Sequence, residues 1–177
     1  NNALKKAPKV SFGRISDGAA RVKHGSWMFV IDFSDCFYHW KLRECDTLWM
    51  GFWDPHRRQF ARFLYATFGG QFCPWLNDVF IKHIVDQLLK ETGIDLVDFV
   101  DDLFGSEDTE QESWGSFEDS VLFFLRHGLR VTIKPSGLKP PATSQDWIGW
   151  TYISKNTNPK IPVDVLVTVC EEKCVEG

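Results

Sequence analysis

Two adjacent aspartates, Asp101 and Asp102, stand between apolar runs in the stretch DLVDFVDDLFGSED at residues 95–108. The runs on either side read as two short strands joined by a tight hairpin turn. Two-residue turns favour Asn-Gly or Asp-Gly because their central positions require positive φ. Asp-Asp is therefore a poor choice for this backbone, and its carboxylates also repel each other. A sequence that breaks a local rule at one point often does so for function.

A third acid, Asp32, ends the apolar run at residues 27–32, which is typical of a buried central strand. If the hairpin pairs beside this strand, Asp32 and the Asp101–Asp102 turn converge at one edge of the sheet. Three carboxylates there would need a cation, and their oxygens suit Mg²⁺ or Mn²⁺. Two such ions about 4 Å apart serve phosphoryl or nucleotidyl transfer. The alternative is a solvated acidic turn without function, which is the commoner case for an Asp-Asp pair considered alone.

Two helices are expected, at residues 74–93 and at about 109–127. Pro74 suits the first position of the former, and Gly93 and Gly128 suit the positions after the two helix ends. The inward faces are expected to carry Leu76, Val79, Phe80, His83, Ile84, Gln87 and Leu88 in the first helix, and Trp114, Phe117, Val121, Phe124 and Leu125 in the second.

Further strands are expected at residues 47–53 and 59–66, paired around the loop 54–58, and at 129–134 and 146–154. Residues 34–42 are interpreted as a turn and short helix, 1–25 as an arm, 135–145 as a loop, and 163–169 as one more β-rich stretch. Helices mixed with a largely antiparallel sheet define the α+β class.

Composition limits the function further. A chain of 177 residues with 44% hydrophobic residues can bury a sizeable core, and some of its eight Trp and fifteen Phe could instead contact a partner or nucleic-acid bases. The net charge of −4 argues against nucleic-acid binding by bulk attraction, so such binding needs local basic patches. The N-terminal Lys and Arg residues and residues 54–62 are candidates, although such clusters are more often solvated faces.

Targeting signals and cysteine spacing bear on the cellular compartment in which the protein is expected. No apolar run is long enough for a membrane span, and the start lacks both Met and a signal-peptide pattern, which suggests a fragment or processed piece. The cysteines are odd in number and lack CxxC spacing, so reduced thiols in the cytosol, nucleus or an organelle matrix are expected. They are Cys36, Cys45, Cys73, Cys170 and Cys174. The last two could begin a metal site, but no further ligand is spaced nearby.

Four segments, in order, resemble the motifs of reverse transcriptases. IDFSDCFYHWKL (31–42) resembles the first catalytic motif, and FVDD (99–102) resembles the Tyr-x-Asp-Asp box with Phe in place of Tyr. YATFGGQFCPWLNDVF (65–80) resembles the Pro-Phe-Gly-Leu segment that leads to Ser/Ala-Pro, and GLRVTIKPSGLKP with DWIGW (128–150) resembles the Lys-containing loop and the Phe-Leu-Gly strand. The closest likeness is to long-terminal-repeat retrotransposons, tyrosine-recombinase retrotransposons and pararetroviruses.

This resemblance implies a right-hand polymerase palm that performs RNA-directed DNA synthesis on a template-primer with dNTPs and Mg²⁺ or Mn²⁺. Asp32, Asp101 and Asp102 match the three metal-binding carboxylates, and the backbone carbonyl of Phe33 would add a ligand to one metal. Phe37 matches an aromatic gate that leaves no room for a ribose 2′-hydroxyl; without the motif it would be taken as a core aromatic.

The resemblance also assigns residues outside the acidic group. Phe68, Gly69 and Gly70, with Pro74, match the segment near the incoming nucleotide and template; an ordinary strand-to-helix turn is the alternative. Lys134 could donate a proton to the leaving pyrophosphate, or be a solvated lysine at a strand end. The departures from the family pattern are Thr67 for Pro, Gly70 for Leu, Asn77 for an apolar aromatic, and Pro135 for Lys.

The fingers and thumb of such enzymes are expected to be mostly absent, because only 31 residues precede Asp32 and little follows Ile153. The expected divisions are an arm or fingers remnant at 1–26, a palm at 27–154, and a tail or the start of a thumb or connection at 155–177. An alternative function is a catalytically inactive, retroelement-derived structural or interaction subunit of a larger complex. Another palm-fold enzyme such as a cyclase would not explain the FYH and Gly-Pro segments, and a Ser/His/Asp hydrolase has no supporting motif.

Overall fold

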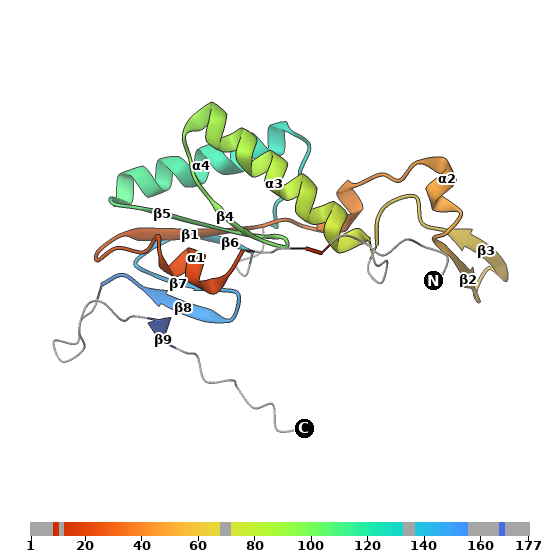
Figure 1. Ribbon diagram of the computed structural model, residues 1–177, viewed down its shortest axis with the longest axis horizontal. Coiled ribbons are helices and arrows are strands. Elements are labelled where there is room, and N and C mark those ends of the chain that lie inside the picture. Colours follow the sequence, from red (N-terminus) through yellow and green to blue (C-terminus); the bar gives the residue numbers. More distant parts are fainter. Residues whose placement is uncertain (1–8, 11–12, 68–71, 133–136, 156–166, 169–177) are drawn as a thin grey trace, which may run out of the picture.

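The computed structural model of the chain describes residues 9–10, 13–67, 72–132, 137–155 and 167–168. A central antiparallel sheet has two long helices on one face and a layer of short elements on the other, and a two-stranded hairpin extends to one side (Figure 1). This mixture of helices and antiparallel sheets confirms the predicted α+β class.

The central sheet has four antiparallel strands in the order β4-β5-β1-β6. They are β1 (Trp27–Asp32), β4 (Val97–Phe99), β5 (Asp102–Glu107) and β6 (Leu138–Ala142). The four central residues of β1 are buried, as expected for an interior strand with a nearly continuous apolar sequence. The predicted central strand and the predicted hairpin beside it are both confirmed.

Successive residues of β1 and β5 point to opposite faces of this sheet. The residues packed with the long helices are Phe29, Ile31 and Leu103, and those in a second cluster on the other face are Met28, Val30 and Phe104. Asp32 lies two residues after Val30, and Asp102 lies two residues before Phe104, so both acids belong to the face of the second cluster. Their side chains therefore lie on the face opposite the long helices.

The long helices are α3 (Cys73–Thr92) and α4 (Glu110–Arg126). Thr109 caps α4 by accepting a hydrogen bond of 3.2 Å from the backbone N–H of Glu112. Gly93 and Gly128 follow the two helices with φ of +80° and +79°, a left-handed conformation that carries no steric penalty for glycine. The predicted helix ends are confirmed.

The buried face of α3 agrees only in part with the prediction. Leu88 is buried and Ile84 packs against the core, as predicted, but Val79 and Phe80 are 44% and 40% exposed. The other buried residues of the helix are Cys73, Asn77, Asp78, Ile81 and Val85. Apolar residues occur on several sides of this helix, so periodicity alone does not decide which side meets the sheet. Pro74 is the second helical residue rather than the first.

The buried face of α4 agrees only in part with the prediction. Phe124 is buried, and Phe117 and Val121 pack against the same core. Trp114 and Leu125 are exposed, and two serines, Ser113 and Ser120, are buried in their place. Small polar residues carry no periodic apolar signal, so this face was not recognisable from the sequence.

The layer on the opposite face of the sheet contains α1 (Ile15–Ala19), β7 (Ser144–Trp147), β8 (Trp150–Ile153) and β9 (Val167–Thr168). Trp147 and Tyr152 are the largest members of the core cluster on this side. Gly18 of α1 lies against the indole of Trp147, where a Cβ atom would come within 2.6 Å of the ring. The arm predicted at residues 1–25 therefore contains a packed helix, which corrects that prediction.

Two further predictions near the C-terminal end of the described residues are wrong. The strand predicted at 146–154 is a hairpin that turns at Ile148 and Gly149, both with positive φ, the combination typical of a type I′ turn. The loop predicted at 135–145 contains β6. Pro140 and Pro141 obscured this strand, but β6 is an edge strand of the sheet, where proline is tolerated.

Between β1 and α3 the chain forms η1 (Cys36–His39), α2 (Glu44–Thr47), β2 (Gly51–Asp54) and β3 (Gln59–Arg62). The predicted short helix and strand pair are thus confirmed, with shorter strands. Among the described residues, β2 and β3 pair only with each other. Phe60 is 82% exposed on this hairpin.

Candidate active site at the paired ends of β1 and β5

Asp32 and Asp102 lie directly opposite each other in the antiparallel pairing of β1 with β5. Residues paired in this way have Cβ atoms about 4.5–5.5 Å apart and point to the same face. Asp101 immediately precedes Asp102 in the turn from β4. The structure therefore brings together the three acids that the sequence singled out.

Backbone hydrogen bonds hold this group in register. The N–H of Asp32 donates to the carbonyl of Gly137 at 2.9 Å, and its carbonyl accepts from the N–H of Thr132 at 2.8 Å. The N–H of Phe33 donates to the carbonyl of Asp101 at 3.0 Å. The acidic turn is thus attached to the end of β1 and not only to its own hairpin.

The turn between β4 and β5 consists of Val100 and Asp101, because Phe99 already pairs with Asp102. This corrects the expectation that both acids occupy the turn. Val100 has φ of +59°, and a β-branched residue in this region is a genuine outlier that costs about 1–3 kcal/mol. Strain of this kind concentrates at functional sites.

The carboxyl groups at this site ionise less readily than usual. Burial, followed by the charge of Asp32, raises the pKa of Asp101. Burial and then the charges of Asp32 and Asp101 raise the pKa of Asp102 to about 6, against the opposing effect of Lys139. Burial and mutual repulsion thus both disfavour the charged forms of these carboxyl groups.

The oxygen atoms at this site bear on whether it can bind a divalent ion. In the described part of the chain, no group of three or more His, Cys, Asp or Glu side chains could hold a metal ion as it stands. Mg²⁺, however, usually takes only one or two protein carboxylates, with water and substrate phosphates as its other ligands. The paired carboxylates of Asp32 and Asp102, with Asp101 beside them, fit that requirement.

Lys139 is a residue near the site that sequence reasoning missed. It lies on β6, opposite Val30 of β1, and its ammonium group lowers the pKa of Asp102. The two prolines that follow it in the sequence favour a loop. Asp102 also borders a cavity of about 530 Å³ that Arg14 and Phe99 help to line.

The remaining predicted site residues have separate places. Phe33 is buried and its ring packs edge-to-face on Phe124, with centroids 4.9 Å apart. Phe37 is 7% exposed and belongs to a small core cluster at the start of α3, so its role as a gate stays a prediction. Lys134 and residues 68–70 (Phe68, Gly69 and Gly70) lie outside the described residues.

Cys36 lies close to the acidic group. Burial and the nearby charges of Asp101 and Asp32 raise the pKa of its thiol to about 12, although a hydrogen bond to Asn77 acts in the other direction. The side chain is therefore a neutral thiol near neutral pH. As such it donates a hydrogen bond from Sγ to Oδ1 of Asn77 at 2.9 Å.

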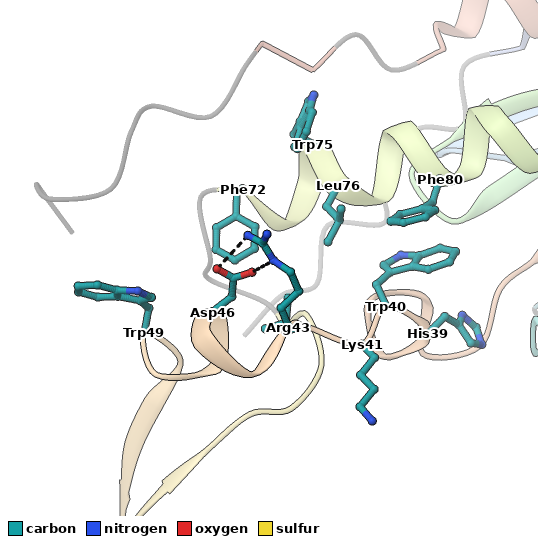
Figure 2. Close-up of a pocket in the computed structure, with 11 residues that line it drawn as sticks. His39, Trp40, Lys41, Arg43, Asp46, Trp49, Phe72, Trp75, Leu76 and Phe80 are labelled. Carbon is teal, nitrogen blue, oxygen red and sulfur yellow. Dashed lines mark hydrogen bonds and ion pairs between the residues drawn. The ribbon is translucent and has the colours of Figure 1, made fainter.

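A groove of about 690 Å³ lies between the first turns of α3 and residues 39–49 (Figure 2). Its aromatic lining consists of Trp40, Trp49, Phe72, Trp75 and Phe80. The rings of Trp40 and Phe80 stack with centroids 4.4 Å apart. An ion pair of 2.7 Å joins Arg43 to Asp46 among the lining residues. Part of the aromatic content of the chain thus lines a surface groove rather than the core.

Solved structures of foamy virus enzymes are similar to this chain. A foamy viral protease-reverse transcriptase in complex with an RNA/DNA hybrid matches with a TM-score of 0.68 and 16% identity over 84% of this chain and 19% of that one. A form of this enzyme with double-stranded DNA matches with a TM-score of 0.69 and 18% identity, over 84% and 25%. The native prototype foamy virus enzyme matches with a TM-score of 0.64 and 19% identity, over 82% and 19%.

These likenesses define the class of fold, which is reverse-transcriptase-like and thus of the kind found in nucleic-acid polymerases. The chain spans a quarter or less of the length of those structures. No family model and no curated protein matches the sequence.

Within the described residues, no helix combines the length and apolar character that crossing a bilayer requires.

Proposed function

We propose that this chain is the palm part of a reverse transcriptase that joins nucleotides by a two-metal mechanism. The observation that carries the proposal is the direct pairing of Asp32 with Asp102, with Asp101 in the adjoining turn. Three partly buried carboxylates at one end of a sheet are unfavourable without a counter-ion. The reverse-transcriptase-like fold supports the same function.

In this proposal Asp32, Asp101 and Asp102 bind the metal ions, and the backbone carbonyl of Phe33 adds an oxygen ligand. When bound, Mg²⁺ or Mn²⁺ would activate the primer 3′-hydroxyl and neutralise charge on the triphosphate. The 3′-oxygen forms a bond to the α-phosphorus of the dNTP, and the bond to the bridging oxygen of pyrophosphate breaks. The hydroxyl proton passes to water, and pyrophosphate takes up a proton from an acid, for which Lys134 is the candidate.

Substrate selection in this proposal depends on neighbouring residues. The ring of Phe37 excludes a ribose 2′-hydroxyl by its bulk, and residues 68–70 contact the incoming nucleotide. The motifs favour an origin in long-terminal-repeat or tyrosine-recombinase retrotransposons or in pararetroviruses. The partners are accordingly an RNA or DNA template-primer and dNTPs.

Primer extension on an RNA template, with Mg²⁺ or Mn²⁺, tests the proposal. Asp101→Asn is expected to lower extension by on the order of 10²–10³-fold or more, because it removes charge where the transition state needs it. Asp98→Asn is the matched control, since Asp98 is a half-buried acid of the same hairpin that pairs with Leu103. Equal extension by the wild type and Asp101→Asn would contradict the proposal.

A second candidate function is that of an inactive interaction subunit of a larger complex. The exposed aromatic residues between α2 and β3 favour it: Trp49 is 66% and Trp53 is 50% exposed. Protein interfaces are enriched in such side chains. A wild-type chain that neither extends a primer nor binds divalent ions would support this function instead.

A further inference from the structure

Asn77 is a fully buried polar residue in α3, with 0% of its surface exposed. An apolar aromatic is common at this position in the sequences that the segment 65–80 resembles. Burial of an amide is unfavourable unless its hydrogen-bonding groups find partners. The position therefore calls for a specific reason.

The amide of Asn77 connects three separate elements. Its Oδ1 accepts hydrogen bonds from Sγ of Cys36 and from Nε1 of Trp40, each at 2.9 Å. Its Nδ2 donates to the backbone carbonyl of Val100 at 2.8 Å. One side chain of α3 thus bonds to the segment after β1 and to the turn that carries Asp101.

The chemistry of these partners fixes the orientation of the amide. The indole of Trp40 can only donate, so it must face the oxygen, and the carbonyl of Val100 can only accept, so it must face the nitrogen. Of the groups that Asn77 contacts, the carbonyl of Val100 is the one that belongs to the acidic turn. A carboxylate at position 77 could still accept from the indole of Trp40 but would repel the carbonyl oxygen of Val100.

We propose that Asn77 is a positioning residue that holds the Val100–Asp101 turn, and with it the carboxylate of Asp101, against the end of β1. Val100 is the residue with strained backbone, at φ of +59°, and the bond to its carbonyl is a contact from outside the hairpin that stabilises this conformation. A second hydrogen bond, from the N–H of Phe33 to the carbonyl of Asp101, reaches the same turn. The turn is thus held by two contacts from outside its own hairpin.

This inference rests on the proposed function for its meaning in catalysis, but its structural part can be measured separately. Residue-resolved amide hydrogen exchange of the full 177-residue chain reports on the Phe33 N–H, which is protected only while the turn stays in place. Asn77→Asp keeps the shape of the side chain and loses the donor to Val100. Asn77→Leu removes every polar contact.

Two controls separate positioning from general stability. Val85→Ala removes buried volume two turns along the same helix, in the main core cluster, and is expected to change exchange only as far as it lowers global stability. Trp40→Phe removes one donor to Asn77 and leaves the bond to Val100. Urea denaturation gives the global stability of each variant, against which the local exchange rates are compared.

Both Asn77 variants are expected to increase the exchange rate of the Phe33 amide by about tenfold or more beyond the global effect, as expected for loss of a buried hydrogen bond. Val85→Ala and Trp40→Phe are expected to show no such excess. In primer extension, the Asn77 variants are expected to lower kcat by about tenfold or more with the KM for dNTP changed less than about threefold, because a displaced acid weakens the transition state more than substrate binding.

Protection of the Phe33 amide in the Asn77 variants equal to that in Val85→Ala, after correction for stability, would overturn the inference. A wild-type chain that extends no primer would instead count against the proposed function, while the exchange comparison still decides whether Asn77 holds the turn. Loss of kcat in Asn77→Asp without any change in exchange would also overturn positioning as the cause.

Discussion

Gly137 and Asp32 lie so close together that a Cβ atom on Gly137 would stand 3.0 Å from Oδ2 of Asp32. The same Cβ would stand 2.5 Å from Cβ of Thr132. The two residues are also joined by the hydrogen bond from the N–H of Asp32 to the carbonyl of Gly137. A side chain at position 137 would therefore clash with Thr132 and press against the carboxylate of Asp32.

Gly137→Ala is expected to destabilise the chain by about 1–3 kcal/mol, because Thr132 and the backbone must shift to admit the methyl group. Gly115→Ala is the control, since a Cβ at Gly115 in α4 meets nothing within 4 Å; alanine there should stabilise by about 0.5–1 kcal/mol. Urea denaturation of both variants checks the contrast. Equal stabilities would show that position 137 is not crowded.

Asp102→Asn is expected to make the metal-free chain more stable at neutral pH. The pKa of Asp102 is about 6 in the folded chain and 3.8 as its ordinary value, so its contribution to stability is present in full below pH 3.8 and is lost as pH rises through about 6. After allowance for solvent screening, the variant should exceed the wild type by about 1–2 kcal/mol at about pH 7.5 and by little at about pH 4. Stability curves that run parallel across this range would contradict the assignment.

Lys139→Met is expected to raise the pKa of Asp102 further, because it removes the cation that favours the charged carboxylate. If Asp102 must be ionised for catalysis, the acid side of the pH–rate profile for primer extension should move to higher pH. Lys41→Met serves as a control, since Lys41 lies at the aromatic groove. An unchanged pH–rate profile in Lys139→Met would show that this lysine does not influence the ionisation of Asp102.

Two phenylalanines distinguish the core from the exposed hairpin. Phe124 is fully buried and packs on Phe33, so Phe124→Ala should cost about 3–5 kcal/mol. Phe60→Ala on β3 should change stability by less than about 0.5 kcal/mol, as for exposed positions generally. Thermal or urea unfolding measures both, and a large loss in Phe60→Ala would mean that the hairpin surface is covered in solution.

Much of the framework around the site could be predicted from the sequence. The apolar run of β1 gave its bounds because an interior strand buries both faces, and Gly93 and Gly128 marked helix ends because their left-handed backbone favours glycine. The convergence of Asp32 with Asp102 could be expected because each acid stands at the end of a strand, and the two strands pair antiparallel.

Other features depend on tertiary contacts that leave no local signal. The buried side of α3 is set by its packing partners, so the apolar character of Val79 and Phe80 predicts burial although both lie exposed. The prolines of β6 favour a loop in the sequence, but β6 is an edge strand, where proline is tolerated. The sequence shows Asn77 only as a departure from a family pattern, because its partners Val100 and Trp40 are far from it in the chain.

Divalent-ion binding tests the central claim most directly. Titration of the purified chain with Mn²⁺, followed by electron paramagnetic resonance of the free ion, should show binding by the wild type and by Asp98→Asn. Asp32→Asn and Asp101→Asn should weaken it by about tenfold or more, since each removes a charged oxygen ligand. Equal Mn²⁺ binding by all four proteins, or none by the wild type, would contradict the assignment of these aspartates as a metal site.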